Sequence, residues 1–205
     1  LAHHGVQHER KELRIVFDTS LRTNGKSLSN SIYTGPDVLQ SLFGVLLRFR
    51  LRPVAVTCDF KAFYHSVLIP ECDRNFYRFF WIDGQSLDSP IGIFRLKIHL
   101  FGGNASQVCA THALFTAIQE AVDQGLISQE IANRIKKSLY SDDLLPSFDT
   151  VEEAVAHALK AREVLAMSNF NLTKFTSTDV EFLRRVPPKH ISPVVQDFDL
   201  KGKVS

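Results

Sequence analysis

The chain contains the stretch SLYSDDLL at residues 138–145, in which apolar residues flank two adjacent aspartates. This pattern predicts a tight β-hairpin with Asp142 and Asp143 at its tip. Upstream, the stretch VAVTCD at residues 54–59 predicts a short buried strand that delivers Asp59 at its C-terminal end. A carboxylate at the end of a buried strand must be hydrated, hydrogen-bonded or bound to a cation. These three acids are therefore the first candidates for a functional site.

Local patterns around these two stretches predict the remaining strands and helices. We expect strands at 13–17, 76–82, 93–98 and 171–176, with turns at Asn24-Gly25 and Asp83-Gly84. We expect helices from Pro36 to residue 49, at 105–123, after Ser128 and at 151–167, where Thr150 and Glu153 form a capping box. The order of elements from 54 to 176 predicts a split βαβ antiparallel sheet with helices on one face, an α+β fold. Residues 1–52 and the hairpin at 76–98 would form a satellite lobe.

The composition is that of an ordinary globular protein, and it excludes several classes. The chain has 205 residues and a net charge of +2, so total charge does not indicate nucleic-acid binding. Two local basic groups, at 48–52 and 134–137, could contact phosphates or simply form solvated faces. No apolar run approaches the roughly 20 residues of a transmembrane helix, and no secretory signal is visible. The first residue is Leu1, so we expect a fragment of a longer protein.

The cysteines and histidines indicate neither a disulfide framework nor a zinc site. Three widely spaced cysteines, Cys58, Cys72 and Cys109, fit a reducing, intracellular compartment. The histidines near the N-terminus lack Cys or acidic partners, so a polar N-terminal segment is the better interpretation.

The three aspartates have the chemistry of a magnesium site. Mg²⁺ prefers carboxylate and phosphate oxygens and uses one or two acids for each ion. Two adjacent strands that carry Asp could hold a pair of ions about 3.5 to 4 Å apart, the arrangement used for in-line phosphoryl transfer. The alternative is that the paired aspartates are only turn residues. The stretches around them favour the catalytic interpretation.

Several motifs occur in the order found in reverse transcriptases. VTCDFKAFYHSV at 56–67 and YSDD at 140–143 resemble the two catalytic motifs of these enzymes, and HLFG at 99–102 resembles their template-gripping motif. Three further stretches resemble the Bel/Pao group of retrotransposons in particular: LAHHGV at 1–6, LRIVFDTS at 13–20 with the TNG and GP that follow, and FNLTKFTS at 170–177. Ala2 and Gln107 stand where this group has Pro, and Ser141 where it has Val. The segment around Gln107 would shape the floor under the nascent base pair.

The resemblance implies roles for the charged residues. Asp59 and Asp142 would bind both metal ions, with Asp143 supporting the site. Arg14 would hold the triphosphate of the incoming nucleotide, where negative charge develops during transfer. Lys174 would protonate the leaving pyrophosphate as a general acid. The plainer alternatives are a strand-edge surface charge for Arg14 and a solvated strand residue for Lys174.

The resemblance also implies a nucleotide-binding group of uncharged residues. Tyr64 would lie under the deoxyribose and exclude a 2′-hydroxyl. Phe101 and Gly102 would contact the nucleotide and the template. The alternative for Tyr64 and Phe101 is that both are plain core aromatics.

The same resemblance implies the fold, the activity and the partners. Residues 1–52 with 76–98 would form the fingers, 53–180 the palm, and 181–205 the start of a truncated C-terminal extension. The expected activity is that of a reverse transcriptase, an RNA-directed DNA polymerase in which a primer 3′-hydroxyl attacks a deoxynucleoside triphosphate (dNTP) with two Mg²⁺ ions, or Mn²⁺. The implied partners are an RNA or DNA template with primer, the dNTP, and the rest of a retrotransposon polyprotein with its protease, thumb, ribonuclease H and integrase. We expect no membrane partner and a cytoplasmic location in a retrotransposon particle. No thumb or ribonuclease H segment can be read, so the chain alone should extend a primer poorly.

Two other classes of function stay open. A non-catalytic RNA-binding remnant of a decayed element would show the same departures from the motifs, and magnesium-dependent primer extension would separate it from an enzyme. A split βαβ binding module would use its acids only as caps. Stacking aromatics on the face of the sheet would favour that module.

Overall fold

The computed structural model describes residues 1–8, 11–84, 86 and 88–197, and the chain divides into two compact units. Unit 1 comprises Leu1–Asp37 and Tyr64–Ala110, and unit 2 comprises Val38–Phe63 and Thr111–Ser205. Both contain antiparallel strands and helices, so the α+β class expected from the sequence is confirmed. Residues 38–52, which the resemblance assigns to the fingers, belong to unit 2. The division into fingers and palm stays a prediction.

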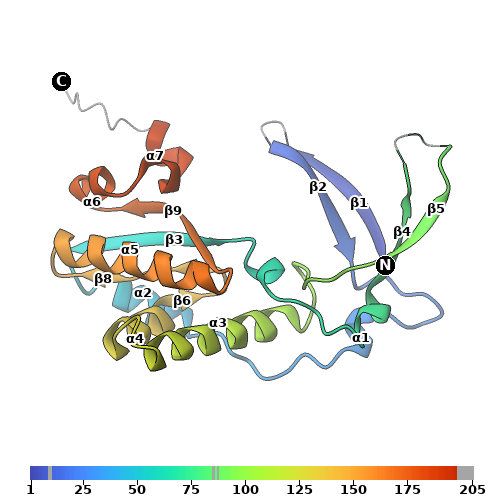
Figure 1. Ribbon diagram of the computed structural model, residues 1–205, viewed down its shortest axis with the longest axis horizontal. Helices are drawn as coiled ribbons and strands as arrows, with labels where there is room; N and C mark the ends of the chain where they lie inside the picture. The colour runs from blue at the N-terminus through green and yellow to red at the C-terminus, as the bar shows by residue number, and fades with distance from the viewer. Residues whose placement is uncertain (9–10, 85, 87, 198–205) are drawn as a thin grey trace. The chain divides into compact units, whose positions relative to one another are not determined.

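Unit 2 is built on a five-stranded antiparallel sheet with β3 (Val54–Lys61) at its centre (Figure 1). Strand β9 (Asn171–Ser177) pairs with one edge of β3. Along the other edge, β7 (Asp143–Leu144) and β8 (Ser147–Phe148) follow one another. Strand β6 (Leu139–Tyr140) pairs with β7 and completes the hairpin that the sequence predicts at 138–145.

Strand β3 is longer than the sequence pattern predicts. We expected it to end at Asp59, but it continues to Lys61, which places Asp59 inside the strand. The reason is that Phe60 is fully buried and continues the row of buried residues Val54, Val56 and Cys58. The strand therefore gains apolar burial beyond the acid, and Asp59 is carried between two buried residues.

The helices of unit 2 cover this sheet. Helix α5 (Val151–Met167) packs against β3, β8 and β9, and it buries Ala154, His157, Ala158, Ala161, Val164 and Leu165. The expected Thr150 cap is confirmed, because its hydroxyl accepts a hydrogen bond from the Glu153 amide. The other half of the predicted capping box differs, because the Glu153 carboxylate accepts its hydrogen bond from the Asp149 amide. Helix α4 (Gln129–Ser138) begins at the expected cap, Ser128. Helix α6 (Val180–Arg185) contacts α5 and β9, and the short α7 (Pro193–Asp197) follows.

Helix α2 (Leu42–Phe49) begins later than the sequence predicts. We expected a helix with Pro36 in its first turn, but residues 36–40 are not helical. The Ser41 hydroxyl accepts a hydrogen bond from the Gly44 amide and so caps the helix there. The expectation at Pro36 was wrong because the Ser41 side chain, five residues downstream, caps the helix and fixes its start there.

Unit 1 consists of two β-hairpins with short helices. Strands β1 (Ala2–His8) and β2 (Lys11–Asp18) form one hairpin, and β4 (Arg78–Ile82) and β5 (Ile91–Arg95) form the other (Figure 1). Strand β1 was not predicted, and β5 lies earlier than the expected 93–98 because Ile98 pairs with Leu68 in an isolated bridge. The short helices are α1 (Leu28–Ser31), η1 (Phe63–Ser66) and η2 (Arg74–Tyr77). Turn residues Asn24 and Gly25 both have positive φ, as a tight turn requires.

Helix α3 (Ser106–Asp123) agrees with the sequence in both position and buried face. The apolar stripe expected along it is buried: Ala110, Leu114, Ala117, Ile118 and Ala121. The helix ends before Gly125, which has a φ of 70°. Among the described residues, no helix is long and apolar enough to cross a membrane.

Candidate active site

Asp59 and Asp143 are direct partners across the sheet of unit 2. In the antiparallel register of β3 and β7, Cys58 pairs with Leu144 and Asp59 pairs with Asp143. Directly opposed residues point to the same face of a sheet, with Cβ atoms about 4.5 to 5.5 Å apart. Two carboxylates that are more than eighty residues apart in the sequence therefore share one face.

The third acid, Asp142, lies in the turn that precedes β7. Tyr140 pairs with Asp143, so Ser141 and Asp142 form a two-residue hairpin loop, and Asp143 belongs to the strand rather than to the tip. The Phe60 amide of β3 donates a hydrogen bond of 2.9 Å to the Asp142 carbonyl oxygen, which holds the loop against β3. Ser141 has a φ of 56°, a left-handed conformation that costs a β-branched residue more than it costs Ser. The departure from Val at this position thus eases the turn.

Lys174 reaches Asp59 through an irregularity in β9. The register between β3 and β9 shifts between Thr57 and Asp59, so β9 carries one extra residue there. Lys174 has a φ of 55°, and its Nζ forms an ion pair with the Asp59 carboxylate. A regular strand would have directed the side chains of β9 in strict alternation, whereas the bulge re-aims Lys174 toward the acid.

The charges of this group act on one another. Partial loss of hydration raises the pKa of the Asp143 carboxyl above its ordinary value, and the charges of Asp142 and Asp59 raise it further, while Lys174 lowers it. Burial raises the pKa of the Cys58 thiol, and Asp143 and Asp59 raise it further. Cys58 is therefore a protonated core residue and not a nucleophile.

The three carboxylates fit a divalent cation in donor chemistry and in charge. They are hard oxygen donors, and their mutual repulsion, which raises the pKa of Asp143, is the kind that a bound cation relieves. Their side chains do not form a ready metal-binding cluster. Within the described part of the chain, no group of three or more His, Cys, Asp or Glu side chains is placed to hold a metal ion. In this structure the cation nearest to Asp59 is the Lys174 ammonium.

Unit 1 brings together Tyr64 and Phe101. Tyr64 lies in η1, and its ring meets that of Phe101 edge to face, with centroids 5.5 Å apart. Phe101 is 75% exposed, so it is not the core aromatic of the plainer alternative, whereas Tyr64 is half-buried. Gly102 has a φ of 81°, and a Cβ atom built on it would meet nothing within 4 Å. The need for Gly there is therefore conformational, and the surface above it is open.

The Tyr64 hydroxyl has a partner that the sequence pattern did not reveal. It donates a hydrogen bond of 2.8 Å to the side-chain carbonyl oxygen of Gln107, which lies 43 residues later at the start of α3. Gln107 attracted attention in the sequence only because Pro was expected there. Arg14, the remaining site residue of unit 1, is exposed on β2 and pairs with Val6 of β1.

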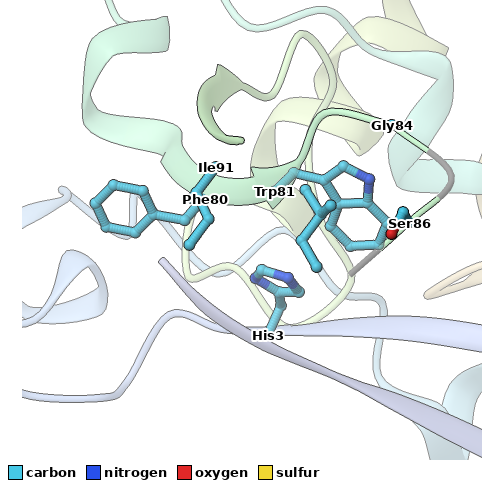
Figure 2. Close-up of a pocket in the computed structure, with 7 residues that line it drawn as sticks. His3, Phe80, Trp81, Gly84, Ser86 and Ile91 are labelled. Atoms are coloured by element: carbon cyan, nitrogen blue, oxygen red, sulfur yellow. The ribbon is translucent and has the colours of Figure 1, made fainter. Parts of the chain in front are cut away.

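A separate hollow of about 350 Å³ lies between the two hairpins of unit 1. Figure 2 shows His3 from β1 opposite the strands that carry Trp81 and Ile91, with the Phe80 ring extending away from His3. The His3 ring lies 5.4 Å from that of Trp81 and also contacts Phe17 and Phe79. The histidines near the N-terminus thus include an aromatic packing residue rather than only a polar segment. None of the predicted site residues lines this hollow.

No protein-family model matches the chain, and no curated protein matches it significantly. Unit 2 carries the acids and Lys174, and unit 1 carries Tyr64, Phe101, Gly102 and Arg14.

Proposed function

We propose that this chain is the fingers and palm of a reverse transcriptase of the Bel/Pao retrotransposon type, an RNA-directed DNA polymerase. The observation that carries the proposal is the pairing of Asp59 with Asp143 across β3 and β7, with Asp142 in the adjoining turn and Lys174 on Asp59. Two neighbouring strands that present acids on one face are the framework that two-metal phosphoryl transfer requires. A structural ion pair alone would not need the two further acids.

Asp59 and Asp142 would hold two Mg²⁺ ions, or Mn²⁺, with Asp143 supporting them. When bound, these ions would supply the positive charge that activates the primer 3′-hydroxyl and stabilises the charge of the transferred phosphate. The raised pKa of Asp143 supports the assignment, because crowded carboxylates gain most from a cation. Lys174 would leave Asp59 and donate a proton to the departing pyrophosphate oxygen.

The residues of unit 1 would select and position the nucleotide. Arg14 is exposed and would neutralise the triphosphate. Phe101 is a large exposed aromatic and would contact the nucleotide, with Gly102 leaving room beside it. The Tyr64 ring would meet the sugar and exclude a ribose 2′-hydroxyl. The partners would be a primed RNA or DNA template, dNTP and the other parts of a retrotransposon polyprotein, inside the cytoplasmic particle of the element.

The test is primer extension on an RNA template by the polymerase polypeptide that contains this chain. We expect extension to require Mg²⁺ or Mn²⁺, and Asp59→Asn or Asp142→Asn to abolish it while leaving the melting temperature within a few degrees. Asp123→Asn is the matched control, because Asp123 is an exposed acid of unit 2 that accepts a hydrogen bond from Gln119 on the same helix. Extension that survives both Asn substitutions would contradict the proposal.

A second candidate function is RNA binding without catalysis. The ion pair between Lys174 and Asp59 favours it, because it satisfies the acid without any metal. This candidate predicts template binding that Asp59→Asn leaves intact and no extension with either metal. The same experiment therefore separates the two functions.

A further inference from the structure

We propose that Gln107 is a specificity-determining residue that acts through Tyr64, by fixing the plane of the ring that distinguishes deoxyribose from ribose. The inference rests on the proposed function, since it assigns a means of sugar selection to the same polymerase site. It starts from the hydrogen bond of 2.8 Å between the Tyr64 hydroxyl and the Gln107 side chain.

Two contacts of Tyr64 bear on the orientation of its ring. Its edge contact with Phe101, at an interplanar angle of 69°, limits the tilt of the ring. Phe101 is itself 75% exposed and provides a weak restraint, because few neighbours fix its own position. The hydrogen bond to Gln107 therefore supplies the firmer point, at the far end of the ring.

Gln107 can serve as an anchor because the start of α3 is fixed. Ser106, the first residue of the helix, is 3% exposed, and its amide donates a hydrogen bond of 3.0 Å to the Gly103 carbonyl oxygen. A Cβ atom at Gly35 would lie 3.1 Å from a methyl carbon of Val108, so another segment of unit 1 packs closely on the first turn. The backbone that carries Gln107 is thus part of a packed helical turn rather than of a flexible loop.

The choice of residue at position 107 matters for chemical reasons. Pro, which the resemblance leads one to expect there, has no side-chain acceptor and would leave the Tyr64 hydroxyl to other partners or to water. Discrimination against one extra hydroxyl group depends on the difference between two fits at one wall of a site. A ring that can move away from the sugar leaves room for the extra hydroxyl group, so the restraint on Tyr64 would set the selectivity.

The experiment is a double-mutant cycle read as the ratio of kcat/KM for dNTP to kcat/KM for the matching ribonucleotide. The proteins are the wild type, Tyr64→Phe, Gln107→Leu and the double variant, each within the polymerase polypeptide that contains this chain. We expect each single change to lower the ratio by about threefold to tenfold, the range for one hydrogen bond, and the double change to lower it no further. The fall should come from a lower KM for the ribonucleotide.

Two controls separate positioning from general damage. Gln107→Glu retains an acceptor and should keep at least half of the wild-type ratio, whereas Gln119→Leu, a change of another α3 glutamine at a remote exposed position, should keep all of it. Equilibrium binding of dNTP and ribonucleotide to complexes with a dideoxy-terminated primer gives the same ratio without any transfer step. Melting temperatures identify a variant that has lost structure.

The outcomes distinguish this inference from the function on which it rests. If the wild type extends no primer with Mg²⁺ or Mn²⁺, the proposed polymerase function fails, and this inference fails with it. If the wild type extends and both single variants keep its sugar ratio within twofold, the function stands and the role of Gln107 is refuted. Additive effects in the double variant would also refute it, because the two residues would then act independently.

Discussion

Replacing Lys174 with Met should lower the free energy of unfolding of the metal-free chain by about 1 kcal/mol. Opposite unit charges about 4 Å apart attract by roughly 4 kcal/mol at an effective dielectric constant of about 20. The Lys174 side chain is 58% exposed and that of Asp59 is 21% exposed, so hydration and the cost of ordering Lys174 reduce the net value to about 1 kcal/mol. For a chain of this size, that change lowers the melting temperature by about 2 to 4 °C.

The assay is thermal unfolding of four proteins, with and without divalent cation. Wild type, Lys174→Met, Asp59→Asn and the double variant give the coupling energy between the two side chains. Without divalent cation we expect a coupling of about 1 kcal/mol. With saturating Mg²⁺ or Mn²⁺ the coupling should fall toward zero, because the bound ion then neutralises the Asp59 carboxylate in place of Lys174. Lys160→Met, which removes an ion pair of 3.5 Å within α5, is the control whose effect should not depend on the cation.

One result would refute the reasoning. Suppose Mn²⁺ raises the melting temperature of the wild type, which shows that it binds the folded chain. If the coupling between Lys174 and Asp59 then stays at its metal-free value, the ion binds elsewhere and Asp59 is not its ligand. The assignment of the acids as a metal site would fail, whatever the extension assay shows.

Three further predictions concern the acids, the sugar site and the core. Asp143→Asn should raise the melting temperature of the metal-free chain at pH 7. Folding raises the pKa of Asp143, so keeping its carboxyl ionised in the folded chain costs stability above that pKa. This cost disappears as the pH falls through the raised pKa, because the carboxyl then becomes protonated. Melting between pH 4 and 8 should show the gain of the Asn variant shrink on the acid side, and an Asn variant less stable than the wild type at pH 7 would contradict this. Tyr64→Ala should increase ribonucleotide incorporation. It should lower the free energy of unfolding by less than the roughly 3 to 5 kcal/mol expected for a fully buried aromatic, because Tyr64 is half-buried. Unchanged sugar selectivity with a larger loss of stability would make Tyr64 a core residue. Phe148→Ala should cost about 3 to 5 kcal/mol in urea unfolding because its side chain is fully buried, whereas Phe43→Ala, at a position 73% exposed, should change stability by less than about 1 kcal/mol.

The elements of unit 2 that carry strong local signals were predictable from the sequence. The caps at Ser128 and Thr150, the stop at Gly125 and the apolar stripe of α3 are local features, and the structure has them where expected. Strand β1 was missed because AHHGVQH has no apolar alternation, and it becomes a strand only by pairing with β2. The start of α2 was misplaced because the pattern after Pro36 did not show that Ser41 would provide the cap.

The candidate site was likewise predictable from the sequence only in part. The acids could be identified because apolar strands flank them, and the pairing of Asp59 with Asp143 then follows from the register of two short strands. The contact of Lys174 with Asp59 could not be predicted from the sequence. It depends on a bulge in β9 and on the left-handed backbone conformation of Lys174, and no pattern in FNLTKFTS indicates either. The bond from Tyr64 to Gln107 joins residues 43 positions apart in two different helices, so it too depends on tertiary packing.

The central position of β3 also has a consequence for how the chain folds. One edge of β3 pairs with residues 143–148 and the other with 171–177, so synthesis must proceed through Ser177 before both edges can be covered. Such distant pairings form slowly, and helices α3 to α5 can form before the sheet closes. A chain interrupted between α5 and β9 would expose an open edge of β3 with its buried apolar row, which is the kind of edge that recruits other chains. Docking of β9 therefore both completes the sheet and protects the nascent protein from aggregation.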